Sequence, residues 1–226
     1  MNTRLDSVIR EHLKRLNLSK KSITKILILT STDFESDSSL NSNRRFNVTI
    51  KKVGVGPTFS VLNSYQYIEK IDPDLIINSG IGGSFNRSDK IGTVVNITED
   101  ILENSKALED EILPLSFDSN YFKEYMIKSY FDRVLDLPNR RGITVSLVSG
   151  NRDLALRRKK VYNAEIESME GFAIMLAAKR FKIPIMQIRS ISNYTGDEKI
   201  TKENLFYSIK MLNNKIKQIL EEQSFE

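Results

Sequence analysis

The sequence contains no cysteine and no tryptophan, and its single histidine is His12. Structural disulfides, cysteine-ligated zinc sites and cysteine nucleophiles are therefore excluded, and a Ser-His-Asp triad could draw only on His12. This histidine lies in an amphipathic amino-terminal segment, where packing or surface exposure is the expected role. We expect neither a metal ion nor an organic cofactor.

Long apolar runs are also absent from the sequence. No stretch approaches the roughly 20 consecutive apolar residues of a transmembrane helix. The amino terminus carries Asp6 and Glu11 and lacks the apolar core of a signal peptide. We therefore expect a cytoplasmic protein that does not bind a membrane.

The composition is that of a globular protein. Of 226 residues, 40% are hydrophobic and 28% are charged, and this length suits one domain with a substantial core. The net charge of +5 raises the question of nucleic-acid binding. The lysines are spread along the chain and suit solvated helix faces, so we expect no nucleic-acid partner.

Short apolar segments alternate with helical patterns through most of the chain, which predicts an α/β fold in three layers. Strands are expected at residues 25–30, 46–53, 74–83, 91–98, 143–149 and 183–191. Helices are expected from residue 57, at 169–181 and at 201–222.

Two parts of the chain need separate treatment. Residues 1–24 are expected to form an appended amino-terminal helix, with its amphipathic face over 4–17, and residues 25–226 the main domain. Residues 105–142 are less regular and rich in aromatic residues. They could form a helix that fills the core or a mobile cap over the site, and the sequence does not decide between these.

Polar residues gather at two edges of the stretch 161–198. They are Glu165, Glu167 and Glu170 where a helix begins, and Arg189, Ser192 and Asn193 where a strand ends. Ligands of open α/β sheets bind beyond the carboxyl ends of the strands. This stretch is therefore the predicted centre of the functional site.

The motifs Glu-Ser-Met-Glu-Gly at 167–171 and Arg-Ser-Ile-Ser-Asn at 189–193 resemble those of the purine nucleoside phosphorylase and nucleosidase superfamily. Within it, the futalosine hydrolase branch is the most similar, with methylthioadenosine/S-adenosylhomocysteine nucleosidase as a near relative. Residues 73–83, an apolar strand that ends in Gly-x-Gly-Gly, also match. The resemblance implies a nucleoside phosphorylase-like αβα sandwich with a mixed central sheet, assembled as a homodimer or higher homo-oligomer.

The resemblance also implies residue roles in cleaving an N-glycosidic bond. Glu35 would activate the attacking water, with Asp33 as the competing candidate. Glu170 would bind the ribose hydroxyls and Met169 would pack on the sugar. Gly82 and Gly83 would present backbone amides to the nucleoside. Asn193 would contact the N7 and O6 edge of the purine. Arg189 and Ser192 would support the site, with Arg189 paired to a carboxylate.

The residue at position 193 directs the choice of substrate. Adenine-cleaving relatives have aspartate here, which can protonate N7, whereas an amide supplies no proton and suits a 6-oxopurine. The implied substrate is futalosine, whose product feeds an alternative menaquinone pathway.

Several alternatives stay open. They are an adenine-cleaving nucleosidase, a purine nucleoside phosphorylase and a non-catalytic nucleoside-binding module. A phosphorylase needs cations around its phosphate, but the loop 31–36 has two acids and no base, and Arg44 and Arg45 lie further along the chain. Phe172 also departs from the small residue usual after Met-Glu-Gly, so the pocket could be reshaped.

Overall fold

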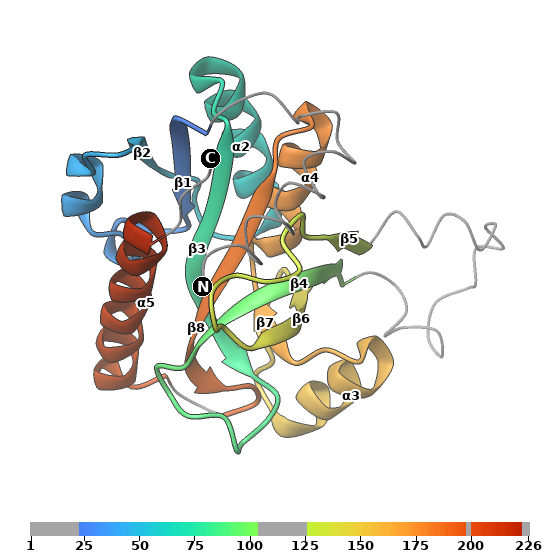
Figure 1. The fold of residues 1–226 in the computed structure, drawn as a ribbon. Coiled ribbons are helices and arrows are strands. Elements are labelled where there is room, and N and C mark those ends of the chain that lie inside the picture. Colours follow the sequence, from blue (N-terminus) through green and yellow to red (C-terminus); the bar gives the residue numbers. More distant parts are fainter. Residues whose placement is uncertain (1–22, 104–125, 198–199, 223–226) are drawn as a thin grey trace, which may run out of the picture.

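The computed structural model describes residues 23–103, 126–197 and 200–222, and a mixed β-sheet runs through this part of the chain (Figure 1). The strands are β1 (Lys25–Thr30), β2 (Asn47–Lys52), β3 (Leu75–Ser84), β4 (Val94–Leu102), β5 (Met126–Lys128), β6 (Asn139–Thr144), β7 (Ile166–Ser168) and β8 (Ile185–Tyr194). The helices are α2 (Pro57–Ile71), α3 (Arg152–Tyr162), α4 (Gly171–Phe181) and α5 (Lys202–Glu222), with short 3-10 turns η1 (Asp33–Glu35) and η2 (Ser38–Ser42).

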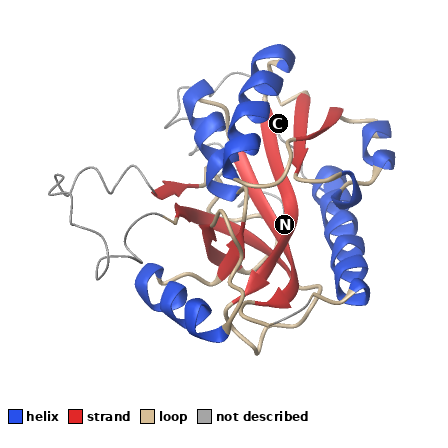
Figure 2. Cartoon of the chain, turned by 180° about the vertical axis from the view of Figure 1, so that it is seen from behind, coloured by secondary structure: helices blue, strands red, loops and turns tan. Residues whose placement is uncertain are grey.

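Helices cover both faces of the sheet. α2 and α4 lie side by side on one face, and α5 covers the other face, as the two opposite views show (Figures 1 and 2). The predicted three-layer α/β architecture with a mixed sheet is therefore confirmed.

Strand pairing brings the ends of distant segments together. β2, β1, β3 and β8 run parallel to one another, so their carboxyl ends meet at one edge. β8 pairs antiparallel with β4, β4 pairs with β6, β6 with β7, and β7 returns to β3. The strands β3, β8, β4, β6 and β7 thus close a ring beside that edge.

The alternation of side chains along β1 divides the core in two. Successive side chains of a strand point to opposite faces. Ile26 and Ile28 belong to the cluster under α5, whereas Leu27 and Leu29 belong to the cluster under α2 and α4. All four are buried. Because both faces of β1 are packed, its register and the position of its carboxyl end are fixed.

Two predicted strands have different bounds in the structure. β4 continues to Leu102, so Glu99 and Asp100 lie inside the strand and not after it. The strand expected at 143–149 instead spans Asn139–Thr144 and stops before Ser149. Partners on β6 explain why β4 can contain two acids. Arg141 pairs with Glu99, and the hydroxyl of Thr144 donates to Asp100.

Sequence patterns missed α3 and β7. α3 fully buries only Ala155, Arg158 and Tyr162, and most of its other residues are charged or exposed, so it lacks a broad apolar stripe. β7 is three residues long and is recognisable only from its pairing with β3 and β6.

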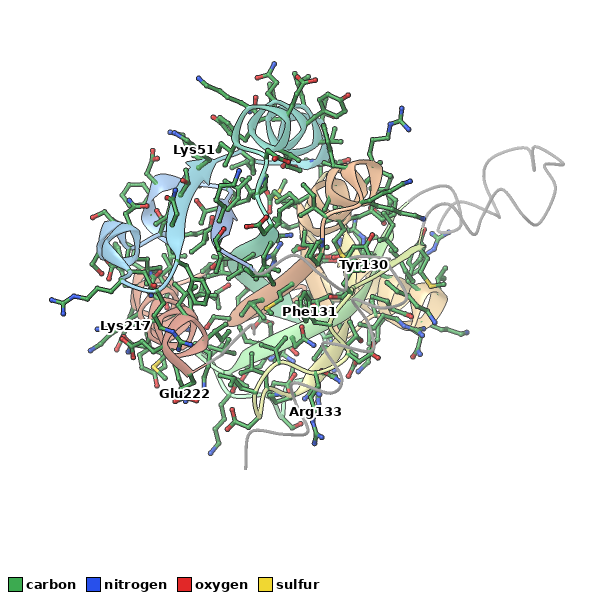
Figure 3. All side chains as sticks on the ribbon, turned by 45° about the horizontal axis from the view of Figure 1, so that its top comes forward. Lys51, Tyr130, Phe131, Arg133, Lys217 and Glu222 are labelled. Carbon is green, nitrogen blue, oxygen red and sulfur yellow. The ribbon has the colours of Figure 1, made fainter. Side chains whose placement is uncertain are left out.

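The appended helix at 4–17, with His12, and residues 104–125 of the irregular segment lie outside the described residues. In the remainder of that segment, Phe131 is buried and Tyr130 packs against the core (Figure 3). These two rings therefore have the core role. Exposed basic side chains lie on separate elements, including Lys51 on β2 and Lys217 on α5 (Figure 3). In the described ranges, none of the helices has the length and apolar character needed to cross a bilayer.

Candidate active site

Glu35 lies just beyond the carboxyl end of β1 and is only 5% exposed. One carboxylate oxygen accepts the backbone amides of Ser31 and Thr32, each at 3.0 Å, and also the Ser31 hydroxyl. The other oxygen accepts the amide of Ile81 in β3 at 3.2 Å. This side chain therefore joins the ends of two neighbouring strands. The competing acid Asp33 points to the surface, where it pairs with Lys52 at 2.6 Å.

Glu170 lies at the same edge of the sheet, as the residue that precedes α4. It is 8% exposed, and its carboxylate accepts the amide of Gly56 at 3.0 Å. Gly56 has a φ of 88°, a backbone conformation that glycine adopts without strain. The Gly-x-Gly turn at 54–56, which by itself is weak evidence of a phosphate site, thus aims an amide at this acid.

Burial is the main influence on the protonation of Glu170. It raises the pKa of the carboxyl group above its ordinary value, and the neighbouring Glu35 raises it further. The Gly56 amide and the Arg189 guanidinium act in the opposite direction. The two acids therefore lie close enough to interact electrostatically.

Arg189 is a fully buried cation in β8, close to both acids. Gly80 makes this approach possible, because a Cβ there would lie 3.2 Å from a Glu35 carboxylate oxygen and 3.4 Å from a guanidinium nitrogen of Arg189. The guanidinium donates to Asn78, at 3.0 Å to its side-chain oxygen. Burial lowers the pKa of Arg189, and Glu170, Glu35 and Asp100 counteract this effect.

The structure corrects the expected ion pair of Arg189. Among the described residues, no carboxylate lies within ion-pair distance of it, and its hydrogen bonds go to Asn78 and to the carbonyl of Ile188 instead. Arg189 acts on the carboxylates around it through its charge.

Asn193 lies at the carboxyl end of β8, beside the glycines of β3. The pairing of these strands shifts by one residue between Gly82 and Gly83, opposite Ser192. A Cβ on Gly83 would lie 3.1 Å from the Asn193 amide nitrogen, and one on Gly82 would lie 2.8 Å from Ile166. Larger residues would therefore push into Asn193 or the sheet.

Hydrogen bonds fix the amide of Asn193. The Ser192 hydroxyl lies 2.9 Å from the amide oxygen of Asn193 and donates to it. The amide nitrogen donates one hydrogen to the carbonyl of Tyr194 at 3.3 Å. Its second hydrogen is left for another acceptor.

Met169 is partly buried next to Glu170. It packs against the small apolar cluster that contains Ile143, Val145 and Tyr162. The structure thus brings Glu35, Glu170 and the Arg189 charge together, and it places Met169 and Asn193 on elements that border them.

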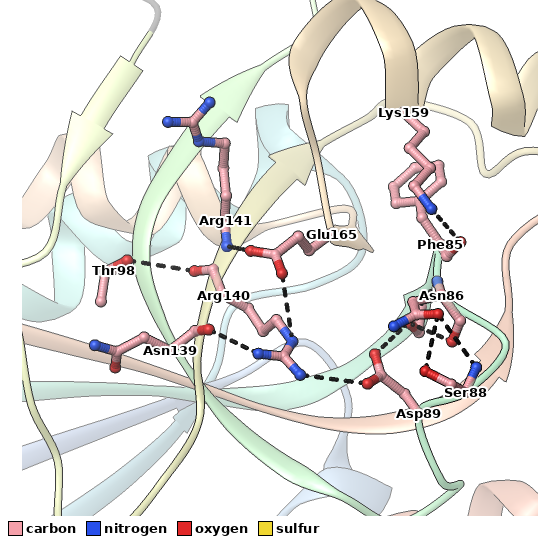
Figure 4. A network of polar contacts seen from close by, with 11 residues as sticks. Phe85, Asn86, Ser88, Asp89, Thr98, Asn139, Arg140, Arg141, Lys159 and Glu165 are labelled. Atoms are coloured by element: carbon pink, nitrogen blue, oxygen red, sulfur yellow. Dashed lines mark hydrogen bonds and ion pairs between the residues drawn. The ribbon is translucent and has the colours of Figure 1, made fainter.

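The three glutamates expected to gather at the start of a helix point in different directions. Glu165 is exposed and faces Arg140 and Arg141 in a surface network that also contains Asp89 (Figure 4). Glu167 is buried on the other side, where it accepts from Ser149 and Arg158. Only Glu170 turns to Gly56. β7 separates the three acids, because Glu165 precedes this strand, Glu167 lies within it and Glu170 follows it.

A buried polar network behind the site was not predicted. Arg158 of α3 pairs with Glu103 at 2.5 Å and with Glu167 at 3.1 Å, and it also donates to the Ser149 hydroxyl. Burial lowers the pKa of Arg158, but the two glutamates outweigh this effect and the net shift is upward. The network fixes the loop after β6 to α3 and β7. Sequence offers no signal for it, since its members are far apart in the chain.

The sequence and the fold match one family. Residues 45–222 match the family model of the phosphorylase superfamily. The chain belongs to this superfamily. Among curated relatives, it is similar to the 5′-methylthioadenosine/S-adenosylhomocysteine nucleosidase of Staphylococcus aureus. The two are 25% identical over 168 residues, which cover 67% of this chain and 70% of the relative.

Solved structures share the fold of this superfamily member. Futalosine hydrolase of Helicobacter pylori has a TM-score of 0.75 at 16% identity, with 89% of this chain and 99% of that chain covered. The 5′-methylthioadenosine/S-adenosylhomocysteine nucleosidase from Helicobacter pylori with butyl-thio-DADMe-Immucillin-A has a TM-score of 0.74 at 18% identity, with 90% and 100% covered. The predicted superfamily, and an enzyme of the nucleosidase kind, are therefore confirmed at this level.

Proposed function

We propose that the protein hydrolyses the N-glycosidic bond of a 6-oxopurine nucleoside, with futalosine as the candidate substrate. The observation that carries the proposal is a pair of buried carboxylates near the buried cation Arg189: Glu35 follows the carboxyl end of β1, and Glu170 binds the amide of Gly56, which follows β2. Asn193 lies at the end of β8. Cleavage builds positive charge on the sugar and negative charge on the leaving base, so a site needs anions at one side and donors at the other.

Glu170 is assigned to the sugar. Its carboxylate would accept hydrogen bonds from the ribose 2′- and 3′-hydroxyls, and its charge would stabilise the cationic sugar of the transition state. The Gly56 amide holds one of its oxygens in place. Met169, directly before it in the chain, would pack on the face of the sugar.

Glu35 is assigned to the attacking water. A carboxylate that is held rigidly can orient a water molecule and take its proton as the bond to the sugar forms. The amides of Ser31, Thr32 and Ile81 provide this rigidity. Arg189 balances the charge of Glu35 and Glu170 from beneath.

The contacts of Glu35 also favour water over phosphate as the nucleophile. Phosphate is bound by backbone amides and cations at strand ends and helix starts. Here the amides of Ser31, Thr32 and Ile81 all donate to Glu35. The nearby Lys52 pairs with Asp33. A phosphate would have to displace an anion that is part of the chain, so hydrolysis is the proposed reaction and phosphorolysis the alternative.

The hydrogen bonds of Asn193 support a 6-oxopurine. Its amide oxygen accepts from Ser192, and its amide nitrogen keeps one hydrogen that it can donate to the base. Both kinds of purine present an acceptor at N7, but position 6 is an acceptor in a 6-oxopurine and a donor in a 6-aminopurine. The similarity to methylthioadenosine/S-adenosylhomocysteine nucleosidases keeps an adenine nucleoside as the second candidate.

Base release from a panel of nucleosides tests these assignments. The purified protein would be incubated with futalosine, inosine, methylthioadenosine and S-adenosylhomocysteine, with and without phosphate, and free base followed by chromatography. We expect hypoxanthine from futalosine, independent of phosphate, and a loss of turnover in a folded Glu170→Gln variant. Adenine release would contradict the role of Asn193, and phosphate dependence would indicate a phosphorylase. No release from any nucleoside would favour a binding module.

A homodimer completes the proposal. Exposed apolar residues lie on α2, on the neighbouring helix α4 and on turns beside them, and some flank the site. They are Phe34, Val55, Phe59, Leu62, Tyr65 and Leu176. Phe34 is 76% exposed next to Glu35, and Val55 is exposed next to Gly56. A second copy on this surface would bury these side chains and border the 5′ side of the substrate.

A further inference from the structure

The first turn of α4 receives its cap from outside the helix. The first amides of a helix have no partner within it, and the N-cap side chain usually accepts from one of them. The N-cap residue of α4 is Glu170, whose side chain makes no such bond because it turns to Gly56. Thr144 of β6 takes over, since its hydroxyl oxygen accepts the amide of Phe172 at 2.7 Å.

Asp100 fixes the orientation of that hydroxyl group. The single hydrogen of Thr144 is donated to an Asp100 carboxylate oxygen at 2.8 Å, which leaves the oxygen lone pairs free to accept from the helix. The second carboxylate oxygen accepts from the Gln187 amide at 2.6 Å. Asp100 and Thr144 are fully buried.

Two glycines make room for this arrangement. A Cβ on Gly171, the first residue of α4, would collide with the Asp100 carboxylate and the Gln187 amide, and one on Gly142 would lie 2.7 Å from the carboxylate. The carboxylate therefore lies directly against the start of the helix, where a negative charge is favourable. None of the reaction steps above uses Asp100, Thr144 or Gln187.

We propose that Asp100 and Thr144 are positioning residues for Glu170. They cap α4 from the sheet, and this leaves the carboxylate of the N-cap residue free to bind the sugar. The inference rests on the proposed function, which assigns Glu170 to the ribose. A reacting group displaced by about 1 Å loses on the order of 100-fold in rate, so a loosened first turn should be visible in turnover.

Matched pairs of variants test the cap. Thr144→Val and Asp100→Ala remove the cap. Thr144→Ser keeps the hydroxyl that accepts from the helix, and Asp100→Asn keeps an oxygen that accepts from Thr144. In Asp100→Asn, the amide oxygen can accept from Thr144, and Gln187 can turn so that its own oxygen accepts from the new amide. That Gln187 oxygen has no partner among the described residues.

Turnover of futalosine to hypoxanthine is the first readout. We expect kcat to fall by about tenfold or more in Thr144→Val and Asp100→Ala, with KM changed by less than about threefold. The two conservative variants should recover most of the rate. In a Glu170→Gln background, Thr144→Val should cost little more, because both changes act through one carboxylate.

Asn96→Ala is the matched control for loss of a buried polar group. Asn96 lies on the same strand as Asp100 and is equally buried, but its amide binds Phe131 and Asn139, away from α4. This variant should lower stability and leave kcat unchanged. Should Asp100→Ala fail to fold, Thr144→Val still decides the question.

Amide hydrogen exchange gives a readout that needs no substrate. Exchange over residues 168–176 should be faster in Thr144→Val than in wild type, while residues 205–216 of α5 stay unchanged. If wild type released no base, the proposed function would fail while this measurement still tested the cap. Unchanged exchange over 168–176, or wild-type kcat in Thr144→Val, would overturn the inference.

Discussion

Replacing Asp100 by asparagine should change the free energy of unfolding more favourably at neutral pH than at acidic pH. Asp100 is fully buried in β4, and burial raises its pKa from 3.8 to about 6. The bonds from Gln187 and Thr144 and the charge of Arg189 oppose this shift without cancelling it. The folded protein therefore holds this proton more tightly than the unfolded chain does.

The sign and size of the effect follow from this difference. Below pH 3.8 the group is protonated in both states and carries no ionisation cost. As the pH rises toward 6, the unfolded chain loses its proton first, so the stability contributed by Asp100 falls. The gap between 3.8 and about 6, at about 1.4 kcal/mol per pH unit, corresponds to about 3 kcal/mol lost by neutral pH.

Chemical denaturation at a series of pH values measures this directly. The free energy of unfolding of Asp100→Asn minus that of wild type should rise by about 2.5 kcal/mol between pH 4 and pH 7, then level off. Taking the difference removes the other titrating groups, including Glu170, because both proteins share them. Asp136→Asn, which removes an 85% exposed acid beside Lys215, is the control for a surface acid and should give a much smaller change. A flat difference for Asp100→Asn would refute the reasoning.

Three further predictions address the site and its surroundings. Asn193→Asp should shift the ratio of released bases toward adenine, measured by competition between futalosine and methylthioadenosine, because aspartate can protonate N7 and accept from a 6-amino group. Arg158→Met should lower the free energy of unfolding by about 3–5 kcal/mol, since it leaves the buried Glu167 and the half-buried Glu103 without their cation. Phe59→Glu should convert the proposed homodimer to a monomer in sedimentation velocity, and an unchanged sedimentation coefficient would place the subunit contact elsewhere.

The position of the site could be predicted because it depends on strand direction. Glu35, Gly83 and Asn193 each follow or end an apolar strand that the sequence shows clearly. Parallel strands bring their carboxyl ends to one edge, so residues far apart in the chain are expected to meet. The structure has these strands parallel, and Glu35 bridges two of them through Ile81.

The support of the site could not be predicted, because it depends on contacts across the sheet. The strand expected at 91–98 ends before Asp100, yet this acid is fully buried within β4. Its partners Thr144 and Gln187 are 44 and 87 residues away in the chain. The sequence does contain one sign of this contact, the glycine at position 171. A side chain there would collide with the carboxylate of Asp100, which only the structure shows.

Glu35 and Glu170 illustrate one way in which a superfamily fold can change its nucleophile. Amides at the ends of strands are suited to anions, whether the anion is a phosphate or a side chain. In this chain the amides of Ser31, Thr32 and Ile81 bind the carboxylate of Glu35. This anion is part of the chain, and in the proposed reaction it takes a proton from the attacking water. A fold that needs cations to hold phosphate has here the buried Arg189 to balance acids that are built into the chain.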